Sequence, residues 1–154
     1  MSKILVFGLF LILNFGALAL GSLLMGSSPI ENEWYVQLNK APWTPPGWVF
    51  GVAWTSIMLL FTIYLTIQEK EKLNNKRFLV LFTLQFLTNV LWNPIFFHFH
   101  WTFLGMVVIL LLFISLVLML YYFNLRSWKS ILLLPYLLWL TIAFSLNTYG
   151  WFMN

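Results

Sequence analysis

The sequence predicts an all-α integral membrane protein built as a five transmembrane helix bundle. Hydrophobic residues make up 62% of the 154 residues and charged residues only 8%. Soluble domains carry about 25% charged residues, so these few charges cannot cover a surface that faces water. A soluble globular protein and a disordered chain are therefore both excluded. The length suits a single domain spanning 1–154.

Charge-free stretches define the spans. No Asp, Glu, Lys or Arg occurs in 4–30, 41–68, 78–125 or 130–154. One spanning helix needs roughly 20 apolar residues. The third stretch would extend about 72 Å as one helix, so we divide it at a turn near His98–Thr102. The five predicted spans are 4–25, 47–67, 78–97, 102–123 and 130–151, and the loop 26–46 joins the first two.

The first span permits a second interpretation. Lys3, an apolar stretch and the Ala-Leu-Ala segment at 17–19 resemble a signal peptide with its cleavage site. The stretch is long for a signal peptide, and it contains Asn14 and Gly21, which suit a packed helix. Ala17 and Gly21 allow close helix contact, which we assign to packing within the bundle rather than to a dimer seam.

Polar and aromatic residues line one face of each of three later spans. Spacings of three and four residues place them on common helical faces. The faces are Gly51, Trp54, Thr55 and Met58; then Gln85, Asn89, Trp92 and Asn93; then Tyr136, Trp139, Ala143 and Asn147. Amides within a membrane need partners, so the faces should point inward. They could simply hold the helices together, but a Trp on each face favours a cavity.

The other tryptophans have simpler assignments. We interpret those at span ends as interfacial anchors: Trp48, Trp101, Trp128 and Trp151. Trp34 and Trp43 lie in the loop 26–46, where the prolines from Pro42 to Pro46 predict a stiff, extended approach to the second span.

Basic residues predict the orientation. With five spans, one face carries Lys3, Lys70, Lys72, Lys76, Arg77, Arg126 and Lys129. The other face carries only Lys40. The positive-inside rule then places the N-terminus inside and the C-terminus outside. Because the basic residues lie in short connectors, we expect the lipid bilayer, and no nucleic acid, as partner.

Several kinds of chemistry are disfavoured. The chain has no cysteine, and its two histidines, His98 and His100, are too few for a metal site. We therefore expect no bound metal. No acid or base lies within a span, although proton relays and ion-coupled pumps need one there.

The motifs resemble the tryptophan-rich sensory protein family, also called TspO or translocator proteins. The similarity covers nearly the whole chain and rests on three blocks. They are Trp34-Tyr35 followed by Pro42-Trp43-Thr44-Pro45-Pro46-Gly47-Trp48 through Trp54; Gln85, Asn89, Trp92 and Pro94; and Pro135-Tyr136-Leu137-Leu138-Trp139 with Ala143 and Asn147.

The resemblance implies a five-helix fold, often a homodimer, whose first loop covers a ligand pocket. It also implies binding of porphyrins, such as protoporphyrin IX, and of isoquinoline carboxamide and benzodiazepine drugs. Transferred to this sequence, the ligand-binding residues are Trp34, Trp43, Phe50, Gly51, Trp54, Asn89, Trp92, Trp139 and Ala143. Trp54 and Trp139 take the catalytic role in light-dependent porphyrin breakdown. The porphyrin is a ligand or substrate and no fixed cofactor is expected.

Two family features do not transfer. The carboxyl-terminal cholesterol motif needs a basic residue after a Tyr, and none follows Tyr149. The glycine interface of some bacterial dimers has no counterpart, because residues 78–97 lack Gly.

Three functional hypotheses remain open. The protein is a porphyrin receptor that also promotes light- and oxygen-dependent degradation, a binding-only signalling protein, or a passive transporter of porphyrin or lipid. The family resemblance suggests a bacterial member in the cell membrane. Porphyrin carboxylates would lie at the outer mouth near Lys40. Free-base porphyrin suits the chain better than haem, because no His or Cys lies within a span to bind iron.

Overall fold

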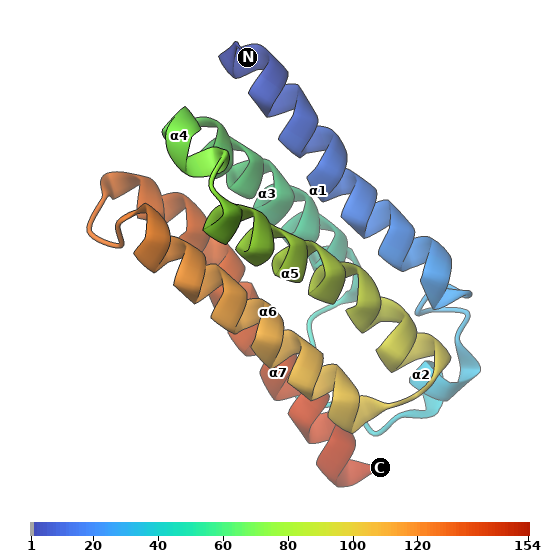
Figure 1. Cartoon of the computed structure of the whole chain (residues 1–154). Coiled ribbons are helices and arrows are strands. Elements are labelled where there is room, and N and C mark those ends of the chain that lie inside the picture. Colours follow the sequence, from blue (N-terminus) through green and yellow to red (C-terminus); the bar gives the residue numbers. More distant parts are fainter. Residues whose placement is uncertain (1) are drawn as a thin grey trace.

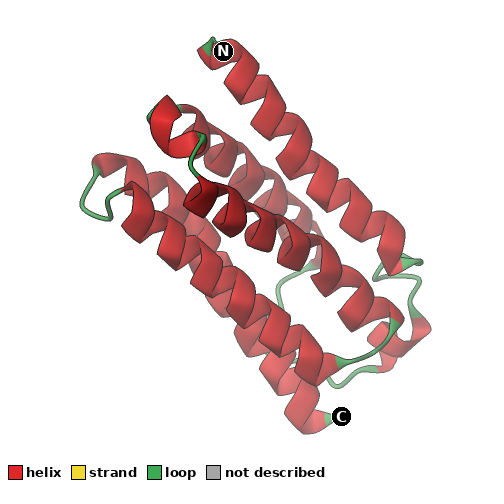
Figure 2. Ribbon diagram, in the orientation of Figure 1, coloured by secondary structure: helices red, strands yellow, loops and turns green. Residues whose placement is uncertain are grey.

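The computed structural model describes residues 2–154 and shows an all-α bundle of long helices (Figures 1 and 2). Five helical segments are long and apolar enough to cross a membrane, which confirms the predicted fold class. The long helices are α1 (Lys3–Met25), α3 (Gly47–Thr66), α5 (Lys76–Asn93), α6 (Thr102–Phe123) and α7 (Leu134–Met153). The shorter elements are α2 (Glu33–Gln37), α4 (Lys70–Leu73), η1 (Pro94–His98) and η2 (Trp128–Leu133).

The long helices form a closed ring. α1 packs against α3 and α5, α3 also meets α7, α7 packs on α6, and α6 returns to α5. Helices that are neighbours in the sequence are therefore not always neighbours in the ring. The close approach of α1 to α5 depends on Gly21, where an added Cβ would lie 2.5 Å from Nδ2 of Asn93. α1 is thus an integral wall of the bundle, and Ala17 and Gly21 pack within the chain as expected.

Prolines explain the two departures from regular α-helix. Pro94 has no N–H to donate, and the chain continues as one π-helical turn, in which the Phe99 N–H donates to the Pro94 carbonyl at 2.9 Å. Pro135 removes a donor from the first turn of α7, and the preceding residues form the 3₁₀ segment η2. The fifth membrane segment therefore begins at Trp128, slightly before the predicted start.

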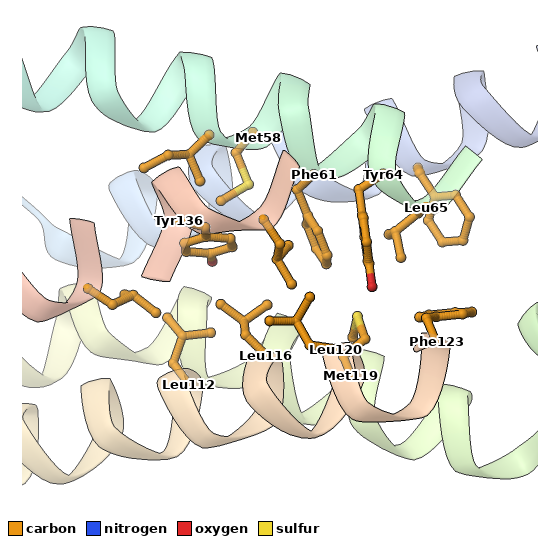
Figure 3. Packing of buried hydrophobic residues seen from close by; sticks show 14 of the residues in the cluster. Met58, Phe61, Tyr64, Leu65, Leu112, Leu116, Met119, Leu120, Phe123 and Tyr136 are labelled. Atoms are coloured by element: carbon orange, nitrogen blue, oxygen red, sulfur yellow. The ribbon is translucent and has the colours of Figure 1, made fainter. Parts of the chain in front are cut away.

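Solid packing fills one half of the bundle (Figure 3). Met58, Phe61 and Leu65 of α3 face Leu116 and Met119 of α6, and all are almost completely buried. Lipid tails are as apolar as these side chains, so dispersion contacts rather than release of water hold this half together. This packed half is the one nearer to α4.

The two ends of the bundle differ in charge. Figure 1 places the N-terminus, α4 and the α6–η2 connection at one end, and α2 and the C-terminus at the other. The first end, here called the basic end, carries the seven basic residues grouped from the sequence. Lys129 also stabilises this end, because its Nζ donates to the Ile67 carbonyl at 2.8 Å, just beyond α3.

Candidate functional site

A small central cavity lies among α3, α5, α6 and α7, in the half of the bundle nearer to α2. Its lining is aromatic and aliphatic, with one amide. The lining residues are Phe50, Trp54, Asn89, Trp92, Ile109, Leu112, Trp139, Leu140 and Ala143. Six of these are ligand residues predicted from the sequence: Phe50, Trp54, Asn89, Trp92, Trp139 and Ala143. The structure therefore brings residues from three separate spans together around one space.

The other three predicted ligand residues lie elsewhere. Gly51 is exposed, and a Cβ added there would meet open space. Trp34 stacks on the His100 ring at 4.2 Å, and the Trp43 indole nitrogen donates to Ser145 Oγ at 3.1 Å. Gly51 is wrong as a cavity-lining residue because its helical position turns it away from the bundle centre. Trp34 and Trp43 belong to the loop that covers one end.

The cavity is too small for a drug-sized ligand in this conformation. Its volume is about 20 Å³, close to the space that one water molecule needs. Pockets that bind drug-sized ligands enclose about 300–1,000 Å³. A porphyrin therefore requires the lining side chains, the helices, or both to move apart.

Each indole in the lining already has an aromatic partner. Trp92 stacks on Phe96 at 5.4 Å, Trp139 meets the ring of Phe50 edge-on at 5.3 Å, and Trp54 meets Tyr136 edge-on at 5.9 Å. The Trp92 nitrogen donates to Asn147 Oδ1 at 3.3 Å. Within residues 2–154, the indole nitrogens of Trp54 and Trp139 have no such acceptor.

A buried polar cluster adjoins the cavity at Asn89. The Tyr136 hydroxyl accepts from Asn89 Nδ2 at 2.9 Å and from Gln85 Nε2 at 3.2 Å. Gln85 Oε1 is buried and has no partner among the described residues. Because an unpaired buried polar atom is unfavourable, this cluster keeps hydrogen-bonding capacity that a water or ligand could use. The sequence identified both polar faces but could not show that they meet.

The loop 26–46 is fastened across the end opposite the basic end. Asn32 Nδ2 donates to the Phe97 carbonyl at 2.9 Å, while its Oδ1 accepts from Tyr35 N at 3.0 Å and caps α2. Burial raises the pKa of Tyr35 above its ordinary value. Lys40 lies over the Tyr35 ring with Nζ 4.6 Å from its centroid. Lys40 therefore contacts the loop itself and is not among the residues that line the cavity, and its expected role beside porphyrin carboxylates at the outer mouth stays a prediction.

His98 is the last residue of η1 and His100 lies in the turn between η1 and α6, which is where the sequence predicted a turn. His100 has a positive φ of 59° and is stacked against Trp34. Within the described part of the chain, no group of three or more His, Cys, Asp or Glu residues could hold a metal ion. His100 instead helps to seat α2 on the turn through its contact with Trp34.

Sequence reasoning missed Ile109, Leu112 and Leu140 as lining residues. α6 is apolar on every side, so no polar stripe distinguishes the two α6 residues from those that face lipid. Leu140 follows Trp139 directly, and an apolar residue in an apolar helix does not indicate which way it faces. Only the position of α6 beside α5 and α7 reveals the fourth wall of the cavity.

The amino-acid sequence is similar to those of known proteins. The TspO/MBR family model matches residues 8–152. The "Tryptophan-rich sensory protein" of Cereibacter sphaeroides is 36% identical over 118 residues, covering 75% of this chain and 73% of the relative. The "Tryptophan-rich protein TspO" of Archaeoglobus fulgidus is 38% identical over 122 residues, covering 79% and 80%. The human "Translocator protein" is 31% identical over 137 residues, covering 82% and 80%. With this match over nearly its whole length, the chain belongs to the TspO/MBR family.

Proposed function

We propose that this protein is a membrane receptor or sensor that binds protoporphyrin IX in the central cavity and promotes its light- and oxygen-dependent degradation. The observation that carries the proposal is the convergence of Trp54, Trp92 and Trp139, with Asn89, on one space. The name of the relative from Cereibacter sphaeroides, a tryptophan-rich sensory protein, supports a sensory role. Flat aromatic drugs of the isoquinoline carboxamide and benzodiazepine classes would occupy the same cavity.

The lining suits a wide and mostly apolar ring. Offset or edge-on aromatic contacts contribute about 0.5–1.5 kcal/mol each beyond the burial of apolar area. Asn89 can orient a polar ring edge without the cost of a buried charge. Because the cavity holds only about 20 Å³, the ligand must select a more open state of the bundle. That shift between closed and open states would be the signal of a sensor.

The degradation step would use the reactivity of the pigment. The photoexcited porphyrin would take one electron from the indole of Trp54 or Trp139, and the ring radical anion would then combine with O2 by forming a carbon–oxygen bond. As the second carbon–oxygen bond forms, the adduct would return one electron to the indole radical, so the net reaction adds O2 to the ring and O2 is the oxidant. The protein supplies position and shields the ring from water, whereas the chemistry belongs to the porphyrin.

The test combines binding with illumination. Protoporphyrin IX is titrated into the purified protein while Trp fluorescence is followed, and the complex is then illuminated in air. We expect saturable quenching, followed by loss of the porphyrin bands with a discrete product. Trp54→Phe and Trp139→Phe should bind porphyrin but abolish product formation, because phenylalanine packs similarly and is much harder to oxidise.

Trp128→Phe is the matched control, because Trp128 is 69% exposed at the basic end. It should bind and degrade porphyrin like the unsubstituted protein. If bound porphyrin bleaches no faster than free porphyrin, the proposed degradation activity is wrong and the protein only binds porphyrin. Absence of saturable quenching would overturn porphyrin binding itself.

A further inference from the structure

A second hollow lies on the outer surface of the bundle, between α5 and α6 at the basic end. It is an open groove of about 710 Å³. Its lining combines a polar rim with an apolar floor. The lining residues are Asn75, Lys76, Arg77, Val80, Leu81, Leu118, Tyr121 and Tyr122. None of them lines the central cavity, so the groove is independent of the proposed porphyrin site.

The rim carries two cations without acidic partners. Lys76 and Arg77 open α5 and are both exposed. Over residues 2–154 the one ion pair is between Lys72 and Glu69, at 3.2 Å, and it lies outside the groove lining. Lys76 and Arg77 therefore have their charges available for an anion.

The floor continues the groove into the apolar part of the bundle. Val80 lies four residues after Lys76, so it is about 6 Å deeper along the helix axis. Val80 and Leu118 are both about half exposed and come from the two walls. Tyr122 already donates to the Lys72 carbonyl at 3.1 Å, whereas the Tyr121 ring is 66% exposed at the groove edge.

We propose that this groove is a binding site for an anionic glycerophospholipid. The lipid phosphate would lie at Lys76 and Arg77, and one acyl chain would follow Val80 and Leu118 towards the bilayer centre. The start of a spanning helix lies at the depth of the lipid headgroups, so charge and apolar floor match the two parts of one lipid molecule. A groove between helices also confines a chain better than a smooth helix surface does.

A second copy of the chain fits this groove less well. An isologous contact there would bring Lys76 and Arg77 of both copies close together, and like charges at an interface oppose association. An ordinary basic surface would also attract acidic lipids, but every exposed cation at the same end would then contribute equally. That difference provides the test.

The experiment measures lipid retention by native mass spectrometry. The protein is released from nanodiscs that contain phosphatidylglycerol and phosphatidylcholine with identical acyl chains. We expect one retained phosphatidylglycerol molecule per chain. The double variant Lys76→Gln/Arg77→Gln should lower the preference for phosphatidylglycerol by about tenfold. The matched control, Lys70→Gln/Arg126→Gln, removes two exposed charges from the same end and should leave the preference unchanged.

A third variant tests the floor without changing charge. Leu118→Trp fills the groove and should also reduce retention, while melting in phosphatidylcholine alone shows that each variant is folded. If the two charge variants lose the preference for phosphatidylglycerol equally, general surface charge explains that preference and the proposal is overturned. Dimers that retain no lipid would assign the groove to a second copy and overturn it as well.

Discussion

Asn89 of α5 donates a 2.9 Å hydrogen bond to the hydroxyl of Tyr136 on α7, across the middle of the ring. α5 and α7 are not adjacent in the ring of helix contacts. This bond, together with the one from Gln85, therefore connects opposite walls beside the central cavity. It also limits how far those walls can separate when a ligand enters.

Tyr136→Phe should destabilise the bundle. The substitution leaves the amide donors of Gln85 and Asn89 without their acceptor, and hydrogen bonds between membrane helices contribute about 0.6–1.7 kcal/mol each. We expect a loss of about 1–3 kcal/mol in the free energy of unfolding, measured by denaturation in mixed micelles. Tyr121→Phe, at an exposed position, is the control. Equal stability of both variants would contradict the role of the polar cluster.

Ala143→Leu should block the central cavity. Ala143 lines a space of about 20 Å³, so three further carbon atoms occupy it completely. Protoporphyrin affinity, measured by Trp quenching, should fall by more than about tenfold. Overpacking should cost about 1–3 kcal/mol of stability. Thr141→Leu, on the exposed side of the same helix, should bind normally, and unchanged binding by Ala143→Leu would place the ligand elsewhere.

Gly21→Ala and Gly16→Ala should change the free energy of unfolding in opposite directions. At Gly21 the new Cβ would lie 2.5 Å from Asn93 Nδ2 and 3.3 Å from the Val90 carbonyl oxygen, whereas at Gly16 it meets nothing within 4 Å. The crowded site should lose about 1–3 kcal/mol. The open site should gain up to about 1 kcal/mol, because alanine favours helix. Thermal unfolding of both variants in one detergent compares them, and similar melting temperatures would argue against close α1–α5 packing.

Labelling can determine the orientation, because the sequence has no cysteine. Asn74→Cys and Ile30→Cys place single thiols at exposed positions on opposite ends of the bundle. We expect a membrane-impermeant maleimide to label Ile30→Cys in intact cells and Asn74→Cys only after the membrane is permeabilised. The reverse pattern would show that the basic end faces outward.

The spans were predictable because the bilayer imposes a simple rule on composition. Stretches without charge located all five long helices, and the long stretch 78–125 had to be divided because of its length. The inward faces of α5 and α7 were predictable too, since Asn89, Asn147 and Tyr136 need partners in a medium without water. The helix boundaries in the structure differ from the predicted ones where proline changes the local hydrogen bonding, at Pro94 and before α7.

Amino-acid composition and the spacing of polar and aromatic residues by themselves determined the membrane class, the number of membrane-spanning helices and five of the cavity-lining residues, and the family resemblance added Phe50. Only the tertiary structure decided that Gly51 faces away, that Ile109, Leu112 and Leu140 complete the cavity, and that the cavity is nearly closed. The reason is physical. Composition and periodicity describe one helix at a time, whereas a cavity is set by the order, rotation and separation of several helices packed together.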